Sequence, residues 1–408
     1  MKFNSIFFKR AVFSIIVLSG VWGAAFFFFG MPQNAPRENS DGGSTATQRI
    51  KNRLDACLAE KPLSKIQQEC LKTLARFMVF SNAFPSARAM LDNMRDPRFL
   101  AICHEFGHYT GWELFQKTKD VLTAYQESSH LCDSGMYHGI MEAYLATHGD
   151  TFRSGHDTAS VVLHACDSVK ESHDTAAGYM SLCLHGVGHG LMFVTDNDLP
   201  RSLIHCDALG DQKESCYTGV YMENGFTSSI PEWSEHAVRF APTRDDPSFP
   251  CRILEARHQK SCYRYQGTLL LELNNWDWPK GLASCAILPE QFRDICMVGI
   301  GNNTPAPSLT IAQTAEKCAL GLQVNERAYE LCIVGAVQFL AQLRLGDAHA
   351  LAEFCGLIQK AQQARCIEES GKMLPGWLRG NETIADKCAV FHDEEKRCLA
   401  AASGQPYR

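Results

Sequence analysis

The sequence predicts an all-α protein: a solenoid-like array of disulfide-stapled helical hairpins that follows an N-terminal transmembrane anchor. Three observations lead to this fold class. An apolar segment opens the chain, and all 18 cysteines come after it. Most of those cysteines fall into closely spaced pairs that recur along the chain. The segments between the pairs carry apolar residues at helical spacing, without the alternation of a strand.

The composition is that of an ordinary globular protein and excludes one class of partner. Of the 408 residues, 45% are hydrophobic and 21% are charged. The 39 basic and 45 acidic residues leave a net charge of −6. Binding to nucleic acid requires a basic face, so we expect no nucleic-acid partner.

We expect residues 1–31 to form a signal anchor that crosses the membrane. Lys9 and Arg10 precede an uncharged apolar run over residues 11–29, close to the length of about 20 residues that spans a bilayer as a helix. The basic flank should stay in the cytoplasm, which places the rest of the chain outside. A cleaved signal peptide is the alternative, but its apolar region is about 7–15 residues long and ends in small residues. Residues 32–49 are rich in proline, glycine and polar residues, which predicts a flexible linker.

The cysteine pairs predict both the repeat and its compartment. From residue 206 onward the members of a pair are 10 to 14 residues apart, and the first members recur every 33 to 45 residues, the length of a two-helix repeat. So many cysteines indicate disulfides in an oxidising, extracytoplasmic compartment, either the periplasm or the cell surface. The expected pairs are Cys57/Cys70, Cys166/Cys183, Cys206/Cys216, Cys251/Cys262, Cys285/Cys296, Cys318/Cys332, Cys355/Cys366 and Cys388/Cys398. Cys103 and Cys132 are then left over and are paired by elimination.

Histidines concentrate in the N-terminal half and predict a metal site. Eleven of the 15 histidines lie between residues 104 and 205. Three pairs of candidate ligands are four residues apart, namely His104/His108, His138/Glu142 and His185/His189. Residues at this spacing share one face of a helix and can chelate one ion. Three such helices could converge on a mononuclear or dinuclear centre. Histidine and carboxylate together suit zinc, iron or manganese, and histidine alone also suits copper; the expected cofactor is a divalent ion, zinc, iron or copper.

Other residues near these pairs are candidates for supporting roles. Neighbouring glycines are expected to keep a pocket open for an ion or substrate; they are Gly107, Gly139, Gly186, Gly188 and Gly190. A lower-ranked set of histidines, with either a ligand-supporting or a structural role, comprises His130, His164 and His205. Met222 and Glu223 are weaker candidates still; Met222 follows Cys216 at the position where two aligned segments carry histidine.

One segment resembles a known catalytic motif. His104-Glu105-Phe106-Gly107-His108 is similar to the His-Glu-x-x-His motif of zincin metallopeptidases. The resemblance implies that His104 and His108 bind zinc and that Glu105 is the general base. Glu127 follows at the spacing of the third ligand in the gluzincin branch. The resemblance covers only residues 104–127.

The sequence therefore divides into a histidine-rich metal-binding domain, residues 50–230, and a cysteine-paired repeat domain, residues 231–408. The first hypothesis is a membrane-anchored, metal-dependent enzyme acting outside the cytoplasm, with Glu105 as a catalytic residue. The alternative is a non-catalytic metal-binding or assembly protein, which would use its repeat face for a protein partner. A gluzincin-like metallopeptidase is a further alternative.

Overall fold

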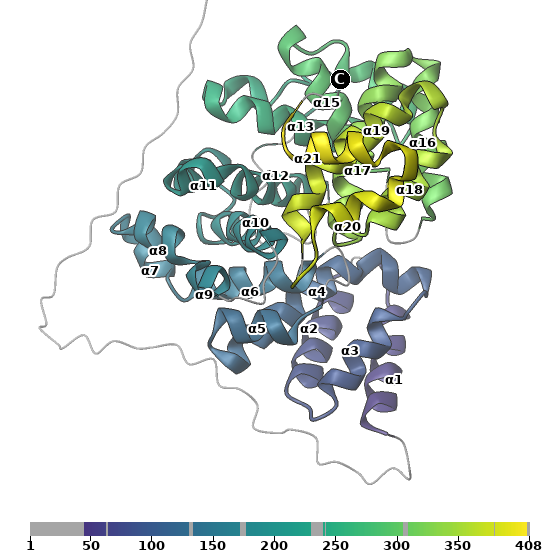
Figure 1. Ribbon diagram of the computed structural model, residues 1–408. Coiled ribbons are helices and arrows are strands. Elements are labelled where there is room, and N and C mark those ends of the chain that lie inside the picture. Colours follow the sequence, from purple (N-terminus) through teal and green to yellow (C-terminus); the bar gives the residue numbers. More distant parts are fainter. Residues whose placement is uncertain are drawn as a thin grey trace, which may run out of the picture. The chain divides into compact units, whose positions relative to one another are not determined.

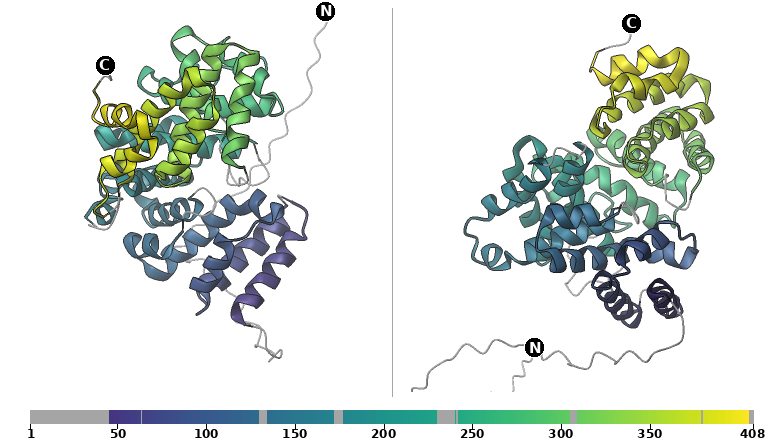
Figure 2. Two further views of the ribbon diagram at one scale, coloured as in Figure 1. Left: turned by 45° about the vertical axis from the view of Figure 1, so that its right-hand side comes forward. Right: turned by 60° about the horizontal axis from the view of Figure 1, so that its bottom comes forward.

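The structure is a computed structural model that describes residues 45–62, 64–129, 134–171, 177–229, 240, 242–304, 309–378 and 380–405. Thr45–Arg408 is one compact unit (Figures 1 and 2). The expected anchor, residues 1–31, lies outside the described residues, as do Cys132 and the expected domain boundary between residues 230 and 231. Within the described ranges, no helix combines the length and apolar character needed to cross a bilayer.

Every regular element in the described part of the chain is a helix, as the spacing of apolar residues predicts. The first half contains α1 (Ala46–Leu58), α2 (Lys65–Val79), α3 (Phe84–Asp92), α4 (Pro97–Thr118), α5 (Val121–Glu127), α6 (Gly135–Ala146), α7 (Gly149–Ser154), α8 (Thr158–His164), α9 (Asp167–Glu171), α10 (Ala177–Val194), α11 (Leu199–Cys206), η1 (Asp207–Gln212) and α12 (Lys213–Ser229). The second half contains η3 (Cys251–Ile253), α13 (Ala256–Leu273), α14 (Trp278–Cys285), α15 (Glu290–Gly301), α16 (Ile311–Ala319), η4 (Leu320–Gln323), α17 (Glu326–Leu343), α18 (Ala348–Leu357), α19 (Lys360–Met373), η5 (Leu374–Trp377), α20 (Ile384–Cys388), η6 (Ala389–Glu394) and α21 (Glu395–Ala402).

The expected linker over residues 32–49 is too long at its C-terminal end, because α1 already begins at Ala46. Thr45 caps this helix by accepting a hydrogen bond from the backbone N–H of Gln48. Other helices are also capped by the side chain of the residue that precedes them. Asp198 and Asp277 each cap a helix with proline at its first or second position, at the start of α11 and α14.

Ten helices, all but α21 at least 12 residues long, form a central row in which each helix packs against the next. The row runs α2, α4, α6, α10, α12, α13, α15, α17, α19 and α21. Shorter helices such as α11, α14, α16 and α18 pack beside this row. The colour gradient in Figures 1 and 2 therefore changes gradually from one packed helix to the next. η5 also contacts α10, so the row curves back toward its N-terminal half.

Eight disulfides confirm the eight pairings that the spacing predicts. In each, the second cysteine lies on a helix of the central row, such as Cys183 on α10 or Cys216 on α12. Each bond therefore fastens a flanking segment to the row. Cys103 is disulfide-bonded as well, while Cys132 lies outside the described residues. This usage indicates an oxidising, extracytoplasmic environment.

Candidate metal centre

Five histidines from three adjacent helices of the central row come together on one side of that row. We call them the histidine cluster: His104 and His108 on α4, His138 on α6, and His185 and His189 on α10. Because α4 packs against α6 and α6 against α10, the i, i+4 pairs of the two outer helices lie on either side of His138. All five belong to the predicted site, and the structure brings them together.

Each i, i+4 pair turns two ring nitrogens toward one another. The Nε2 atoms of His104 and His108 are 3.1 Å apart, and those of His185 and His189 are 3.2 Å apart. His138 lies between the pairs. Its ring centroid is 5.2 Å from that of His108 and 4.3 Å from that of His189.

The opposite ring nitrogens are held by groups on neighbouring helices. These contacts join His108 Nδ1 to Glu142 at 2.8 Å, His189 Nδ1 to Glu223 at 2.9 Å, and His185 Nδ1 to Thr218 at 2.7 Å. A ring that donates its Nδ1–H to a carboxylate or hydroxyl oxygen leaves the lone pair on Nε2 free. Metal-binding histidines usually have this arrangement, since the partner fixes both the tautomer and the ring orientation.

His138 has no such partner. It is 1% exposed, and neither its Nδ1 nor its Nε2 makes a hydrogen bond to the described residues. A buried polar atom without a partner costs about 1–3 kcal/mol. The ring therefore fits a site whose ligand would satisfy its nitrogens.

The donor atoms group at distances that suit metal binding. Three sets each have their donor atoms within 4.8 Å of one another: His104/His108/His138, His138/His185/His189 and His108/Glu142/His189. All six predicted ligands occur in at least one set. Glu142 has two possible roles, because it also holds Nδ1 of His108.

Burial keeps most of the cluster uncharged. It lowers the pKa of His185 to about 4, and the charge of His108 acts in the same direction. Burial and the neighbouring imidazoles also hold the pKa values of His138 and His189 well below the ordinary value. At neutral pH these three rings are therefore neutral and can donate lone pairs.

Nearby carboxylates raise the pKa of one member of the cluster, His108. Burial lowers the pKa of His108, but the adjacent carboxylate of Glu142 outweighs it, and the resulting pKa is about 9. Burial, reinforced by the charge of Glu142, raises the pKa of Glu223 to about 8. Imidazoles and carboxylates thus share protons in a poorly solvated site, and a bound cation would compete for the same positions.

Glycines let the helices approach closely enough for the rings to meet. A Cβ on Gly139 would overlap the carbonyl oxygen of His108, and one on Gly219 would overlap that of His185. A Cβ on Gly188 would collide with the main chain at Cys216. The expectation that Gly139 and Gly188 keep a pocket open is therefore wrong, because the backbone of the facing helix fills that space.

The gluzincin arrangement does not form. The Glu127 carboxylate lies 3.1 Å from Nζ of Lys117 and belongs to none of the candidate ligand sets. Glu105 is only partly exposed and accepts a hydrogen bond from the Tyr109 hydroxyl, one helical turn away. Burial raises the pKa of Glu105, with the positive charge of His108 acting against it.

The lower-ranked histidines lie elsewhere or outside the described residues. His164 is exposed and pairs with Asp167 at 2.6 Å, and His205 packs on Phe152. His130 lies outside the described residues.

Glu223 is only a weak candidate by the alignment of the cysteine segments, but the sequence carries a second signal for it. His108 and Glu142 are 34 residues apart, and so are His189 and Glu223. Adding the repeat length to each histidine would have found both carboxylates.

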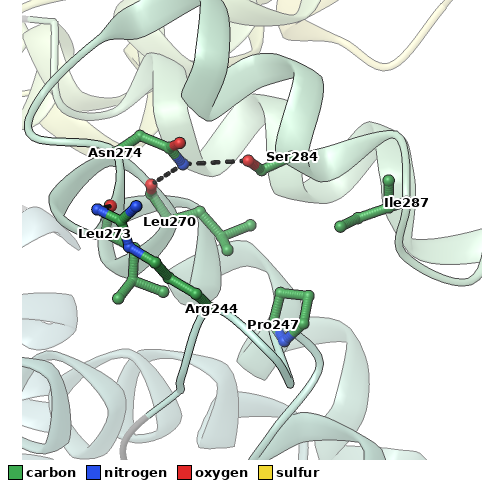
Figure 3. A pocket seen from close by; sticks show the side chains of 7 residues that line it. All are labelled: Arg244, Pro247, Leu270, Leu273, Asn274, Ser284 and Ile287. Carbon is green, nitrogen blue, oxygen red and sulfur yellow. Dashed lines mark hydrogen bonds between the residues drawn. The ribbon is translucent and has the colours of Figure 1, made fainter.

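The C-terminal half contains a hollow. It has a volume of about 220 Å³ and lies between α13 and α14, as Figure 3 shows. The lining is mostly apolar, the guanidinium of Arg244 donates to the carbonyl of Leu273, and Asn274 donates to Ser284. Its polar groups are thus occupied, so the histidine cluster is the stronger candidate.

No family description, curated protein or solved structure matches the chain. The interpretation of the site therefore depends on its geometry.

Proposed function

We propose that this protein is a membrane-anchored, extracytoplasmic, metal-dependent enzyme whose histidine cluster holds a divalent metal ion. One observation carries the proposal. Two i, i+4 histidine pairs lie against His138. The two Nε2 atoms are 3.1 Å apart within the first pair and 3.2 Å apart within the second. In a tetrahedral site with metal–nitrogen bonds of about 2.0–2.1 Å, neighbouring ligand atoms are about 3.3–3.4 Å apart.

The donor chemistry limits which metals fit. The proposed ligands are His104, His108, His138, Glu142, His185 and His189. Imidazole-rich sites suit zinc, copper and iron, whereas calcium and magnesium prefer oxygen ligands. The proposed cofactor is therefore zinc, iron or copper.

The proposed chemistry is metal-activated water or dioxygen chemistry. A bound ion of this kind can act as a Lewis acid and lower the pKa of a coordinated water. Burial and the Tyr109 hydrogen bond position Glu105 beside the cluster. We propose that Glu105 accepts or returns the proton. His104, Glu105 and Glu223 are only partly buried, so this side of the cluster is the proposed route for substrate.

The second candidate function is a non-catalytic metal-binding or assembly protein. The deep burial of His138 and His189, each 1% exposed, favours a permanently held ion. Azide added to the cobalt-loaded or copper-loaded protein distinguishes the two functions. A change in the visible spectrum indicates an open coordination position, as an enzyme needs, while an unchanged spectrum indicates a saturated, non-catalytic site.

The scaffold is proposed to be a solenoid-like array of hairpin repeats, with residues 50–230 as the metal-binding part and residues 231–408 as a plainer array. Each histidine–glutamate contact joins residues 34 apart, and the first cysteines of the disulfides from Cys251 onward recur every 33 to 37 residues, which supports the repeat. All candidate ligands lie within residues 50–230, which supports the division of roles. The array would be anchored to the membrane by a helix within residues 1–31. Its repeat face is available to a protein partner.

Metal analysis of the full chain tests the proposal. We expect the purified protein to carry metal, and His185→Ala/His189→Ala to lose at least half of it. His156→Ala/His164→Ala is the matched control, because both of its histidines are exposed and outside the cluster. Equal metal content in the wild type and the cluster variant would contradict the proposal.

A further inference from the structure

We infer that the histidine cluster binds two metal ions and that His138 bridges them through its two ring nitrogens. This inference rests on the proposed metal-binding function and concerns the number of ions and the ligand they share. One ion would lie at the α4 pair, His104 and His108. The other would lie at the α10 pair, His185 and His189.

The first support is that His138 completes two separate triads. A donor atom of His138 lies within 4.8 Å of one donor atom each of His104 and His108, and a donor atom of His138 likewise lies within 4.8 Å of one each of His185 and His189. Each triad consists of one chelating pair from a single helix and the ring from α6. Three protein nitrogens per ion leave a fourth, open position at each, as catalytic metal sites require.

The second support is the environment of the His138 ring. In the other rings whose contacts are described on both sides, one nitrogen faces its helical neighbour and the other is held by Glu142, Glu223 or Thr218. His138 differs from these rings, because both of its nitrogens are buried and neither has a hydrogen-bond partner among the residues that the structure describes. A single ion could use only one of them, and the other would stay buried and unsatisfied. Two ions satisfy both.

The third support is the number of donors. Five imidazoles exceed the four positions of a tetrahedral ion, even before Glu142 is counted. The set His108, Glu142 and His189 offers a competing place for one central ion. However, Nδ1 of His108 already binds Glu142 and Nδ1 of His189 binds Glu223, so their free Nε2 atoms face their own helical partners instead.

The coordination chemistry balances simply. Neutral His138 carries one ring proton. Binding the first ion uses the free lone pair, and binding the second releases that proton to solvent, which leaves a bridging imidazolate. Such a bridge couples the unpaired electrons of two Cu²⁺ ions, and this coupling can be measured without any assay of activity.

The test loads the full chain with Cu²⁺ after chelation, then measures copper per chain and the double-integrated electron paramagnetic resonance signal. We expect two copper ions per chain and, at low temperature, far fewer than two spins. His138→Ala should restore one spin per bound copper. His104→Ala/His108→Ala should keep one copper with its full spin, and His185→Ala/His189→Ala should do the same. His156→Ala/His164→Ala should match the wild type.

The outcomes separate the inference from the function on which it rests. One copper per chain in the wild type overturns the inference but leaves the proposed function standing. Two coppers with two full spins overturn the bridging role of His138. Loss of all copper from both pair variants, with wild-type near-ultraviolet circular dichroism, also overturns the two-ion arrangement. No bound copper, zinc or iron in the wild type refutes the proposed function itself.

Discussion

Glu223 lies 2.9 Å from Nδ1 of His189, and this contact turns Nε2 of the same ring toward His185. The carboxylate comes from α12, whereas the ring lies on α10, so the packing of two successive helices sets the ring orientation. The same relationship is found two steps earlier in the row, between His108 on α4 and Glu142 on α6. In both contacts, a carboxylate from the neighbouring helix of the row therefore orients a candidate metal ligand.

Glu223→Gln is expected to weaken metal binding about 10- to 100-fold, the usual effect of removing a carboxylate that orients a ligating histidine. The amide keeps the shape but cannot release a proton to form the carboxylate that would support a bound cation. Competition with a chromophoric chelator measures the affinity. Glu326→Gln, an exposed position at the start of α17, is the control and should change nothing. Equal affinities in the two variants would show that Glu223 has no such role.

Glu127→Gln is expected to leave the metal content unchanged, because the carboxylate pairs with Lys117 instead of joining the cluster. Elemental analysis of the purified variant checks this. The gluzincin alternative makes the opposite prediction, since it requires Glu127 as a zinc ligand. Loss of metal from Glu127→Gln with retained folding would bring that alternative back.

Local patterns predicted the scaffold well. Apolar spacing and cysteine pairs gave the helices and eight disulfides, because both signals act over short stretches of chain. The i, i+4 pairs likewise identified His104, His108, His185 and His189 as members of one cluster, because helix geometry alone puts each pair on one face.

Features set by contacts between helices were harder to predict. The close crossings at Gly139 and Gly188 depend on the facing backbone, so the sequence suggested an open pocket where there is none. Glu127 matched a motif spacing, but spacing does not determine where a side chain points. The Glu127 carboxylate forms an ion pair with Lys117 instead. The central position of His138 also depends on how α6 sits between its neighbours.

Gly219→Ala is expected to destabilise the fold by about 1–3 kcal/mol and to weaken metal binding. Its Cβ would overlap the carbonyl oxygen of His185, so α10 and α12 must separate. Gly356→Ala is the matched control, because a Cβ at this helical position meets open space and alanine favours the helix by about 0.5–1 kcal/mol. Urea unfolding and chelator competition measure the two effects. A Gly219→Ala protein with wild-type stability and affinity would contradict the close-crossing argument.

Acid should destabilise the metal-free protein partly through His185. Its pKa is about 4 in the folded protein and about 6.5 when unfolded, so the unfolded chain binds the extra proton between these values. Stability therefore falls as the pH drops from 6.5 toward 4, by about 2 kcal/mol at pH 4.5 for this residue. His185→Gln removes the titrating group. Urea unfolding at pH 7 and pH 4.5, with disulfides intact, should show a smaller loss for the variant. An equal loss in both proteins would count against the burial of His185.

Removing single disulfides should separate stability from metal binding. Cys166–Cys183 and Cys388–Cys398 close loops of 17 and 10 residues, and each should contribute about 3 kcal/mol in the chain-entropy model. Cys183 precedes His185 by two residues on α10, whereas Cys398 lies on α21, far along the row. We therefore expect both cysteine-to-serine double variants to unfold at lower urea concentration, but only Cys166→Ser/Cys183→Ser to bind metal more weakly. Equal losses of affinity would mean that the array transmits strain along its length instead of confining it to neighbouring helices.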